Sequence, residues 1–563
     1  MKPWWDQWPE RLEYEINELK QVGANILDTN KDVNAGLLQV IFTYVLNGSN
    51  TTFIVEYPPT YPFTRFELFA PNLDLHHHQN PLLKNLCVLP RRSENWDLAY
   101  TVGGFLRDRV GQVLAAATAA DTQSASGLEV EQAEPIATYL PYAENSNVLI
   151  DSNFRIPPGA NNGTFKLGIE TVSETTLRGA ILELRADDNS MIYLAPDAIG
   201  LLYKTTHVFT WSRTKTLPIM LPKAFELALT ATKVIGKPAW LYFGSLPVDI
   251  RGIVAPDETG WRVTGDTFIC LVRVRMDRKG FRPGKYWSTF MVRPDRLPTI
   301  SVRAPELAPL AEKAVAIVGA GCLGAAAVLE FARAGVREIR IMDDDVVEAG
   351  TTIRWPLGLS AAGRHKVIAL AEFIAKNYPN VAVRPLVRRF GATQSMGGAK
   401  ADEIEQFFSD VDAIYDATAE EGISYPLSEE ARRRSCTYTA VYGLAGAWGG
   451  RVVRIRPATA GCWVCYKLAI DEGVIPTPPS DQKLVQPIGC AEPTFTGANF
   501  DMQHITLLGV RASVLYLVQS SANAPTDMSD DIFTLSLRTA AGDPITPYWQ
   551  SFPLLRHMKC ENH

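Results

Sequence analysis

The sequence has no segment with the pattern of a membrane span or an export signal. The N-terminal residues Met1–Asp6 lack the apolar stretch that a secretory signal needs. The uncharged run Ala314–Leu329 is too short and too rich in glycine to cross a bilayer. We therefore expect a cytoplasmic protein that does not act at a membrane.

An excess of charge of either sign is also missing. The 563 residues include 55 lysines and arginines against 61 aspartates and glutamates, which gives a net charge of -6. Because there is no basic surplus, we expect no nucleic-acid partner. Hydrophobic residues make up 46% of the chain and charged residues 21%, as in ordinary globular proteins. A chain of this length usually divides into about three domains.

Cysteine is sparse, with eight residues scattered from Cys87 to Cys560. In a chain this long, that spacing does not form a disulfide framework, and it fits a reducing compartment. Individual thiols are therefore candidates for chemistry.

The hydrophobic pattern divides the chain into three folded regions and a linker. Residues 1–120 combine an amphipathic helical pattern with alternating strands, which predicts an α+β domain. Residues 121–145 are small and polar and are expected to form a linker. Residues 146–303 contain short alternating runs, which predict a β-rich connector domain of unknown role. Residues 304–563 contain a nucleotide-binding pattern, so we expect a multidomain α/β protein with a Rossmann-like C-terminal domain.

A glycine loop opens the C-terminal region. An apolar strand runs into Gly319, Gly321 and Gly324, and the following strand ends at Asp343. Glycines in this pattern let backbone amides approach a phosphate at a helix N-terminus, and the acid can bind ribose hydroxyls. The loop alone fits a nicotinamide dinucleotide as well as ATP.

Two cations after the ribose acid favour ATP. Arg354 and Lys366 follow Asp343 at a short distance along the chain, where a nicotinamide site has no use for them. Fixed cations suit a reacting triphosphate, because charge builds on the phosphate during the reaction. Arg354 by itself would be a surface ion-pair residue; its spacing from Asp343 and Lys366 supports the functional interpretation.

The segment from Asp343 to Lys366 resembles the adenylating, ThiF-type domain of ubiquitin-activating enzymes and sulfur-carrier adenylyltransferases. The resemblance implies that Asp343 and Asp345 lie at the nucleotide, that Arg354 and Lys366 lie along the phosphates, and that Asp416 ends a later strand near Mg²⁺. The sequence departs from the family at two positions. The family's asparagine is Thr351, and the acid expected after the Asp416 triplet is Ala419, with Glu420 one place later.

A CxxC pair, Cys462 and Cys465, follows the nucleotide signature. Such a pair supplies half of a tetrahedral zinc site, and the related adenylyltransferases complete that site with a second pair. The sequence contains no second CxxC, which leaves Cys490, Cys560, His557 and His563 as completing ligands. Semi-buried thiols and a redox pair are the alternatives.

Cys490 stands in a loop punctuated by glycine and proline, with Pro493 close behind. Ubiquitin-activating enzymes place their catalytic cysteine in a comparable crossover loop, so the resemblance implies that Cys490 is the nucleophile that receives the activated acyl group. Cys465 is the substitute candidate, and an inert buried thiol is the plain alternative.

The region around Cys87 resembles a ubiquitin-conjugating domain. A Tyr-Pro-Phe turn at 61–63 and a histidine segment precede Cys87, and Trp96 follows it. The resemblance implies that Cys87 carries an acyl group and that an asparagine stabilises the oxyanion. The family's His-Pro-Asn segment is altered here, so Asn80, His77 or His78 would take that role. The alternatives are a metal site formed by the histidines with Cys87, and a buried strand thiol.

The two resemblances together indicate a fusion of conjugating and activating enzymes, as in bacterial antiphage defence operons of the CBASS type or related conjugation systems. ATP and Mg²⁺ are the expected cofactors, with zinc as a candidate. The expected partners are a ubiquitin-like protein, or a cyclic-nucleotide synthase with a ubiquitin-like C-terminal tail, and a target lysine, and we expect a homodimer. The alternatives are an NAD-dependent oxidoreductase, a non-catalytic adaptor, and a sulfur-carrier adenylyltransferase.

Overall fold

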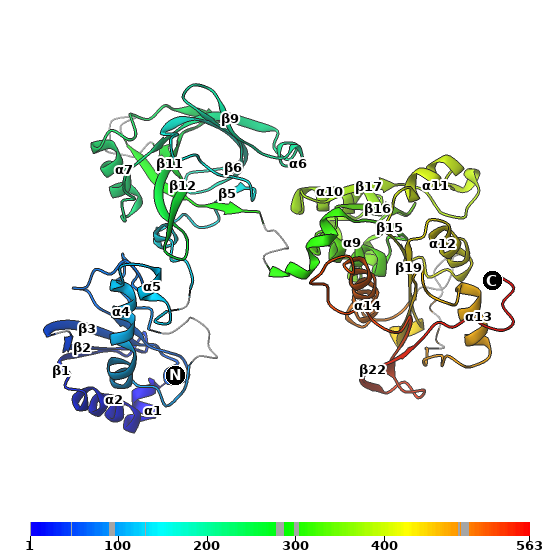
Figure 1. Ribbon diagram of the computed structural model, residues 1–563, viewed down its shortest axis with the longest axis horizontal. Coiled ribbons are helices and arrows are strands. Elements are labelled where there is room, and N and C mark those ends of the chain that lie inside the picture. The colour runs from blue at the N-terminus through cyan, green and yellow to red at the C-terminus, as the bar shows by residue number, and fades with distance from the viewer. Residues whose placement is uncertain are drawn as a thin grey trace. The chain divides into compact units, whose positions relative to one another are not determined.

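The computed structural model describes residues 2–46, 48–88, 96–129, 131–276, 286–297, 303–481, 483, 485 and 495–562. The chain forms two compact units. The first contains Met1–Pro196 and Tyr203–Leu297, and the second contains Asp197–Leu202 and Pro298–His563. The ribbon in Figure 1 shows sheets and helices in both units, which confirms the mixed α/β class.

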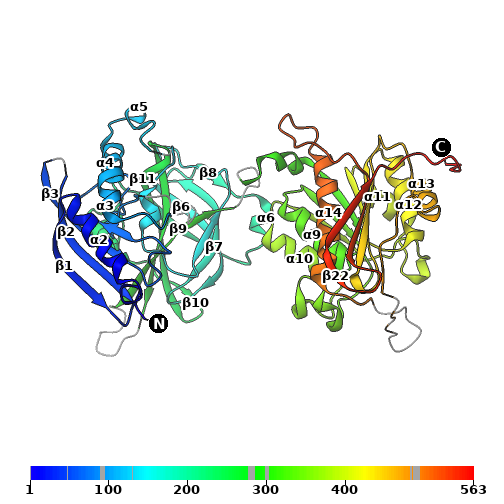
Figure 2. The same cartoon turned by 90° about the horizontal axis from the view of Figure 1, so that it is seen from below.

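The first unit begins with a four-stranded antiparallel sheet in the order β1-β2-β3-β4. Its strands are β1 (Asn25–Asp32), β2 (Leu37–Leu46), β3 (Ser49–Tyr57) and β4 (Glu67–Phe69). Side chains in β2 and β3 alternate between buried and half-buried positions, because one face of the sheet is packed. Helix α2 (Pro9–Gln21) lies along this sheet in Figure 2, preceded by α1 (Trp4–Gln7).

A buried carboxylate joins the elements of this region. Glu15 on α2 is fully buried and accepts hydrogen bonds from the Tyr57 hydroxyl (3.1 Å), from the Arg11 guanidinium (2.8 Å) and from the Val102 amide (3.1 Å). Burial raises the pKa of the Glu15 carboxyl, and the hydrogen bonds oppose the shift. The helical segments that follow are α3 (Val102–Phe105), the π-helical η2 (Leu106–Val110), α4 (Gly111–Thr118) and α5 (Thr122–Ala125).

The rest of the first unit is built on a ten-stranded sheet. Its main path runs β13-β12-β11-β9-β6-β7-β5-β14, with β10 paired to β11 and β8 to β7. The strands are β5 (Asn147–Ile150), β6 (Asn162–Val172), β7 (Leu177–Ala186), β8 (Met191–Leu194), β9 (Thr205–Arg213), β10 (Leu241–Phe243), β11 (Leu246–Gly260), β12 (Val263–Arg275), β13 (Trp287–Val292) and β14 (Pro294–Arg296). Two shorter helices, η3 (Ile136–Tyr139) and α7 (Pro222–Ala231), accompany them, whereas α6 (Asp197–Gly200) belongs to the second unit.

The second unit contains an eight-stranded sheet in the order β17-β16-β15-β18-β19-β20-β21-β22. The five strands from β17 to β19 are parallel, and the pairs from β19 to β22 are antiparallel. The strands are β15 (Ala314–Val318), β16 (Glu338–Met342), β17 (Ala382–Leu386), β18 (Ala413–Asp416), β19 (Thr437–Gly443), β20 (Gly449–Ile455), β21 (Ile532–Arg538) and β22 (Pro544–Phe552). The strand order reverses between β15 and β18, and in open α/β sheets ligands bind at such a point.

Helices cover both faces of this sheet (Figure 1). One buried cluster joins α9 (Cys322–Arg333), α10 (Lys366–Asn377) and α14 (Asn499–Leu517) to the sheet. A second cluster joins α11 (Ala401–Phe408), α12 (Glu421–Arg433) and α13 (Trp463–Asp471) to the other face. The 3₁₀ turns are η4 (Pro305–Glu312), η5 (Ala349–Ile353), η6 (Gly358–Ala361), η7 (Gln394–Met396) and η8 (Ala445–Ala447). The Rossmann-like arrangement expected for this region is therefore present.

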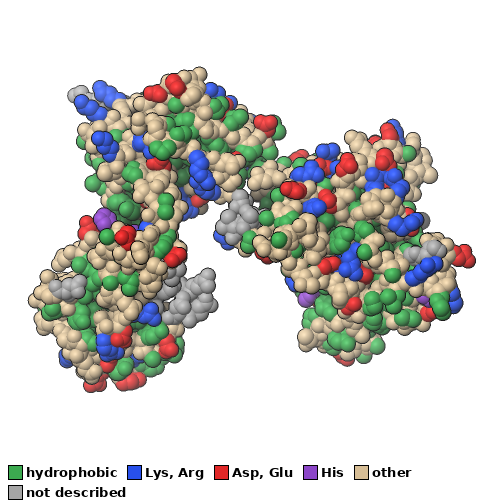
Figure 3. All heavy atoms as spheres, in the orientation of Figure 1, with side chains coloured by type: hydrophobic (Ala, Val, Ile, Leu, Met, Phe, Trp, Pro, Cys, Tyr) green, Lys and Arg blue, Asp and Glu red, His purple; other side chains and the backbone are tan. Residues whose placement is uncertain are grey.

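Within the described part of the chain, every helix is too short or too polar to cross a membrane. The face drawn in Figure 3 carries basic and acidic side chains intermixed, with apolar side chains between them.

Candidate functional site

The candidate nucleotide site lies where β15 and β18 end side by side. Val318 and Asp416, the last residues of these two strands, are in register. The glycine loop follows Val318 and leads into α9, whose N-terminus therefore faces the end of the sheet. The unpaired amides and the dipole of a helix N-terminus favour a phosphate at this position.

Close packing explains two of the loop glycines. Gly319 has a φ of +88°, and a side chain there would approach the backbone of Ala417 to 2.8 Å. A side chain on Gly324 would lie 1.9 Å from the carbonyl oxygen of Gly319. The third glycine differs, because a Cβ on Gly321 would meet no atom within 4 Å. Packing therefore does not require a glycine at this position, which lines both of the cavities described below.

Asp343 is tied to the glycine loop. Its carboxylate accepts hydrogen bonds from the amide of Ala320 (2.6 Å) and from the amide of Asp345 (2.8 Å). Burial raises the pKa of the Asp343 carboxyl, while nearby Lys366 and the two amides lower it. The side chain is therefore held at the end of β16, where the sequence places the ribose acid.

Two adjoining cavities lie at this end of the sheet. The first, of about 240 Å³, is lined by polar groups that include Asp343, Asp345 and Lys366. The second, of about 290 Å³, is lined by Arg354 and Lys366 together with apolar side chains. Gly321, Lys366, Ala417 and Thr418 line both cavities. The two cations predicted from the sequence are thus brought to one place.

Neighbouring groups hold both cations. The Lys366 ammonium lies 2.7 Å from the Asp345 carboxylate. The Arg354 guanidinium donates to the carbonyl of Gly497 (3.4 Å) and lies over the ring of Phe495 at 5.6 Å. The next side chain, Trp355, donates to the carbonyl of Ala320 (2.9 Å), which fixes the segment against the glycine loop.

The first cavity has lining residues that the sequence analysis missed. Arg388, Arg389 and Phe390 follow β17 and line this cavity, together with Ile423 of α12. A signal for them was available, because β17 is parallel to β16 and its carboxyl end must reach the same edge of the sheet. Two consecutive arginines at a strand end are therefore further candidates for contact with an anionic ligand.

The Asp416 carboxylate is buried, with 1% of the residue exposed. It accepts hydrogen bonds from the amide and hydroxyl of Thr418 and from the hydroxyls of Ser424 and Tyr438. Among the family departures noted in the sequence, Ala419 lines the second cavity and Glu420 lines the first.

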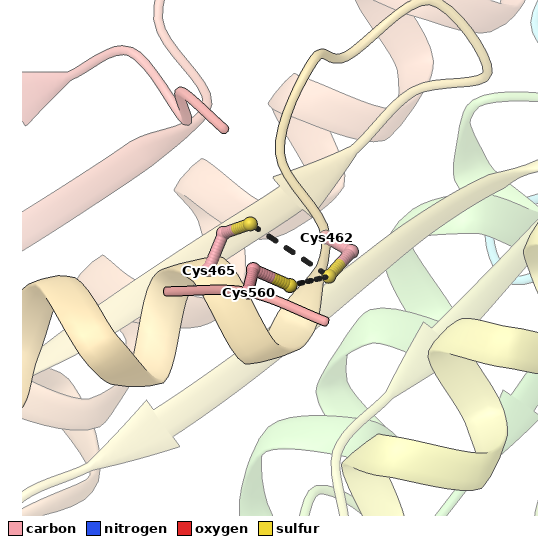
Figure 4. Close-up of side chains that lie close together, drawn as sticks. All are labelled: Cys462, Cys465 and Cys560. Atoms are coloured by element: carbon pink, nitrogen blue, oxygen red, sulfur yellow. Dashed lines mark hydrogen bonds between the residues drawn. The ribbon is translucent and has the colours of Figure 1, made fainter. Parts of the chain in front are cut away.

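The CxxC pair meets a third cysteine. Cys462, Cys465 and Cys560 are buried, and their sulfur atoms lie within 4.8 Å of one another (Figure 4). The Cys462 sulfur is 3.8 Å from that of Cys465 and 3.6 Å from that of Cys560. His557, another completing ligand considered from the sequence, donates its backbone amide to the Cys465 sulfur (3.3 Å), while its ring lies beside Glu472. Cys490, Pro493 and His563 lie outside the described residues.

Cys87 lies in the first unit and is half-buried. Its amide donates to the carbonyl of His78 at 2.8 Å, so the histidine segment runs directly beside it. The side-chain oxygen of Asn80 accepts from the amides of Leu82 (2.9 Å) and Leu83 (3.0 Å) and so caps the following turn. These hydrogen bonds use the side-chain oxygen of Asn80. Stabilising an oxyanion would require a donor, which in Asn80 is the side-chain amide nitrogen.

Two carboxylates hold the His78 ring. Its Nε2 atom lies 2.5 Å from Glu129, and its Nδ1 atom lies 2.9 Å from Glu134. Glu129 also binds Arg262 (2.8 Å) and the indole nitrogen of Trp261 (2.7 Å). The segment expected to be a linker therefore contributes partly buried ion pairs. Burial lowers the pKa of His78, but its hydrogen bonds and ion pairs with Glu134 and Glu129 outweigh burial and raise it.

These shifts predict a pH window for the His78 contact. Because its pKa is raised above the ordinary 6.5, His78 contributes stability in full below that pH and loses it as the pH rises through the folded-state pKa. Burial raises the pKa of Glu129, but hydrogen bonds from Arg262 and Trp261 and the His78 contact lower it to about 2, so its contribution is lost as the pH falls from 4.5 toward that value. We expect the free-energy cost of His78→Gln to be greatest between about pH 5 and 6 and to decrease above pH 7. Denaturant unfolding monitored by tryptophan fluorescence measures this cost, and a difference between the two proteins that stays constant from pH 5 to 9 would contradict the ion-pair assignment.

Comparison with known proteins agrees with the geometry of the second unit. The ThiF family model matches residues 297–497. The chain is 30% identical to protein y4qC of Sinorhizobium fredii over 566 residues, covering 96% of this chain and 94% of that protein. It is also similar to the adenylyltransferase and sulfurtransferase UBA4 of Yarrowia lipolytica, with 30% identity over 22% of this chain and 28% of that protein. The ATP-dependent ubiquitin transferase-like protein Cap2 of Enterobacter hormaechei is 23% identical over 35% of this chain and 32% of its own length. The chain therefore belongs to the same family as y4qC, and its C-terminal unit contains a ThiF-type adenylation domain.

Proposed function

We propose that this protein activates the C-terminal carboxylate of a protein or peptide by ATP-dependent adenylation and passes the acyl group through Cys490 and Cys87 to an amine. One observation carries the first step, namely that Asp343, Lys366 and Arg354 line two adjoining cavities at the topological switch point of the sheet. The similarity of this unit to UBA4 and Cap2 supports the same chemistry.

The two cavities suit the two reactants of an adenylation. In the proposed reaction, ATP occupies the polar cavity, with its ribose at Asp343 and its phosphates toward Gly321 and the N-terminus of α9. The substrate carboxylate enters through the second cavity and attacks the α-phosphorus. A new oxygen–phosphorus bond forms, the bond between the α- and β-phosphates breaks, and pyrophosphate leaves. Lys366 and Arg354 stabilise the negative charge that develops between the cavities. Mg²⁺, when bound with ATP, neutralises further phosphate charge.

The cysteines extend the adenylation into a relay. The thiolate of Cys490 attacks the acyl adenylate, forms a thioester and releases AMP. The thiolate of Cys87 then attacks this thioester, and the lysine amine of a target attacks the second thioester to give an amide and the thiol. The half-buried Cys87 beside the His78 segment supports its role as acceptor, and Asn80, His77 and His78 remain the candidates for oxyanion stabilisation.

The proposed substrate is a ubiquitin-like protein or a cyclic-nucleotide synthase with a ubiquitin-like tail, acting in antiphage defence with the enzyme as a homodimer. Pyrophosphate exchange into ATP tests the first step, because the exchange requires a reversible adenylation of the added carboxylate. We expect exchange with the full-length protein and the ubiquitin-like product of a neighbouring gene, and no exchange when the tail is shortened. An oxidoreductase would instead bind NAD without exchange, an adaptor would show no exchange, and a sulfur-transfer enzyme would form a persulfide on Cys490.

The three buried cysteines fit a structural zinc ion. Two thiolates bound at about 2.3 Å to a tetrahedral ion lie about 3.8 Å apart. The Cys462 sulfur lies 3.8 Å from that of Cys465 and 3.6 Å from that of Cys560. We propose that Cys462, Cys465 and Cys560 supply three ligands to Zn²⁺, which joins the C-terminal segment to the start of α13.

This zinc site predicts a specific loss in Cys560→Ser. The substitution should reduce bound zinc from one ion per chain to nearly none and should destabilise the second unit by about 3 kcal/mol or more, because structural zinc contributes directly to folding. Elemental analysis and thermal unfolding measure the two effects. Cys436→Ser is a matched control, because Cys436 is also buried in the second unit but lies outside the cluster. The site would be ruled out if wild-type protein, purified from cells grown in zinc-containing medium, contained no bound zinc.

A further inference from the structure

The hydrogen bonds of Asp416 leave no position for a metal ion. Its Oδ1 atom accepts from the Thr418 amide (3.0 Å) and hydroxyl (2.7 Å), and its Oδ2 atom accepts from the hydroxyls of Ser424 (2.6 Å) and Tyr438 (2.7 Å). An ionised carboxylate has about four acceptor positions, and these four donors occupy them. Mg²⁺ requires oxygen ligands at 2.0–2.1 Å and usually keeps several waters. A buried carboxylate with four donors does not fit that requirement, so the magnesium role expected from the sequence does not fit Asp416.

The donors come from three different elements, which makes Asp416 a junction. Thr418 belongs to the turn after β18, Ser424 lies in the first half of α12, and Tyr438 lies on β19. The Ser424 hydroxyl is also hydrogen-bonded to the hydroxyl of Tyr442, so the network continues along β19. A buried, fully satisfied polar network of this kind holds its members in one arrangement.

The turn that Asp416 holds forms the boundary between the two cavities. Ala417 and Thr418 line both cavities, Ala419 lines the second, and Glu420 lines the first. Ala419 has a φ of +57°, in the left-handed region that costs free energy for a residue other than glycine. The amide of Glu420 donates to the Thr418 hydroxyl (3.2 Å), which continues the chain of hydrogen bonds from Asp416 through the turn.

This turn also lies against the glycine loop. There is no room for a side chain on Gly319, because the backbone of Ala417 would be 2.8 Å from it. A movement of the turn of a few tenths of an ångström toward β15 would therefore displace the loop that faces the phosphates. The position of the turn thus controls the polar cavity on one side and the apolar cavity on the other.

We infer that Asp416 is a positioning residue, which together with Ser424 and Tyr438 fixes the turn between the nucleotide cavity and the acyl cavity, and that it does not bind the metal ion. The inference rests on the proposed function in one respect, namely that the nucleotide occupies the cavity lined by Asp343. It assigns roles to Ser424 and Tyr438, which have no expected contact with either substrate.

Nucleotide affinity with and without Mg²⁺ distinguishes a positioning residue from a metal ligand. The probe is α,β-methylene-ATP, which the enzyme cannot cleave at the reacting bond, titrated calorimetrically into the full-length protein in Mg²⁺ and in EDTA. We expect Ser424→Ala and Tyr438→Phe each to weaken binding about fivefold, the equivalent of one hydrogen bond, and Asp416→Asn to weaken it about tenfold or more. For each variant, the affinity for the nucleotide should decrease by the same factor in Mg²⁺ and in EDTA.

Tyr415→Phe is the matched control. It removes a buried tyrosine hydroxyl from the residue before Asp416, but that hydroxyl is directed to the carbonyl of Thr506 and not to the turn. The control should bind the nucleotide like the wild type. All titrations are made well below the measured unfolding temperatures, where a variant that is merely less stable retains its affinity.

The inference is overturned if Asp416→Asn loses the effect of Mg²⁺ on affinity while Ser424→Ala and Tyr438→Phe bind like the wild type. It is also overturned if these two variants cannot be distinguished from Tyr415→Phe. In both cases the wild type still binds nucleotide and the proposed function stands. A wild-type protein that does not bind the nucleotide in either buffer would instead refute the nucleotide site, and this inference with it.

Discussion

Replacing Cys87 with alanine should remove one of two thiol-sensitive adducts with the substrate protein and reduce conjugation to lysine at least about a hundredfold, because the relay loses its second acyl carrier. Cys87 is half-buried, and its amide is fixed to the carbonyl of His78. A half-buried cysteine whose backbone is fixed in this way suits the acyl acceptor of the proposed relay. Non-reducing gels of the full-length protein with ATP, Mg²⁺ and the ubiquitin-like partner measure the adducts directly.

A second substitution, Cys87→Ser, tests directly whether residue 87 receives the acyl group. A serine at this position should accumulate an ester that resists reducing agents, because an oxygen ester exchanges with thiols far more slowly than a thioester. Cys270→Ala is the control within the same unit, since Cys270 is fully buried on β12 and burial raises the pKa of its thiol to about 12. The relay would be refuted if Cys87→Ala kept both adducts. The assignment of the activating nucleophile would be wrong if Cys490→Ala left the loading of Cys87 intact.

The candidate nucleotide site was largely predictable because its residues follow strand ends. Gly319 comes after β15 and Asp343 comes after β16, and parallel strands bring their carboxyl ends to one edge of a sheet. The distance in sequence from Asp343 to Lys366 is spanned by two short 3₁₀ turns, after which α10 begins at Lys366 itself. Strand ends and a helix start are fixed by local patterns, and these patterns can be seen in a sequence.

Other contacts depend on long-range packing and left no local signal. The approach of Cys560 to Cys462 requires the C-terminal segment to return to the start of α13. The ion pair between His78 and Glu129 lies in a stretch whose composition is typical of a linker, yet Glu129 is directed inward by Arg262. The composition of a segment indicates its average burial. Whether one charged side chain within it is directed inward depends on the group with which it pairs.

The role of Asp416 illustrates how a motif identifies a position without defining its chemistry. The sequence correctly predicts an acid at the end of β18, in register with the strand that precedes the glycine loop. Hydrogen-bond donors from α12 and β19 then determine what that carboxylate can do. The sequence does not suggest that Ser424 and Tyr438 pair with Asp416, because Ser424 lies on the following helix and Tyr438 lies on the next strand of the sheet.

The second large effect is expected at Lys366, where alanine should reduce pyrophosphate exchange by about two to three orders of magnitude. This is the range observed when one preorganised hydrogen-bond donor to a developing negative charge is removed. The Lys366 ammonium lines both cavities and is held by Asp345 at 2.7 Å. Its charge is therefore in place before the triphosphate reacts. The interaction of the Lys366 ammonium with the phosphates strengthens as negative charge develops. The substitution should therefore decrease the affinity for ATP only several-fold, and most of its effect should be on the exchange rate. Arg354→Ala should behave in the same way, since its guanidinium lines the second cavity.

Arg364→Ala is the matched control for Lys366→Ala. Arg364 lies two residues earlier and carries the same charge, but it is paired with Glu372 at 2.6 Å and lines neither cavity. Its loss removes an exposed ion pair of little energetic value, so exchange should change less than about twofold. Both substitutions remove one positive charge from the same stretch of chain. Any difference between their exchange rates therefore reflects the position of the Lys366 charge between the cavities and not the net charge of the domain. Equal losses in the two variants would show that the cation acts only through the general field of the protein, and the proposed transition-state contact would have to be abandoned.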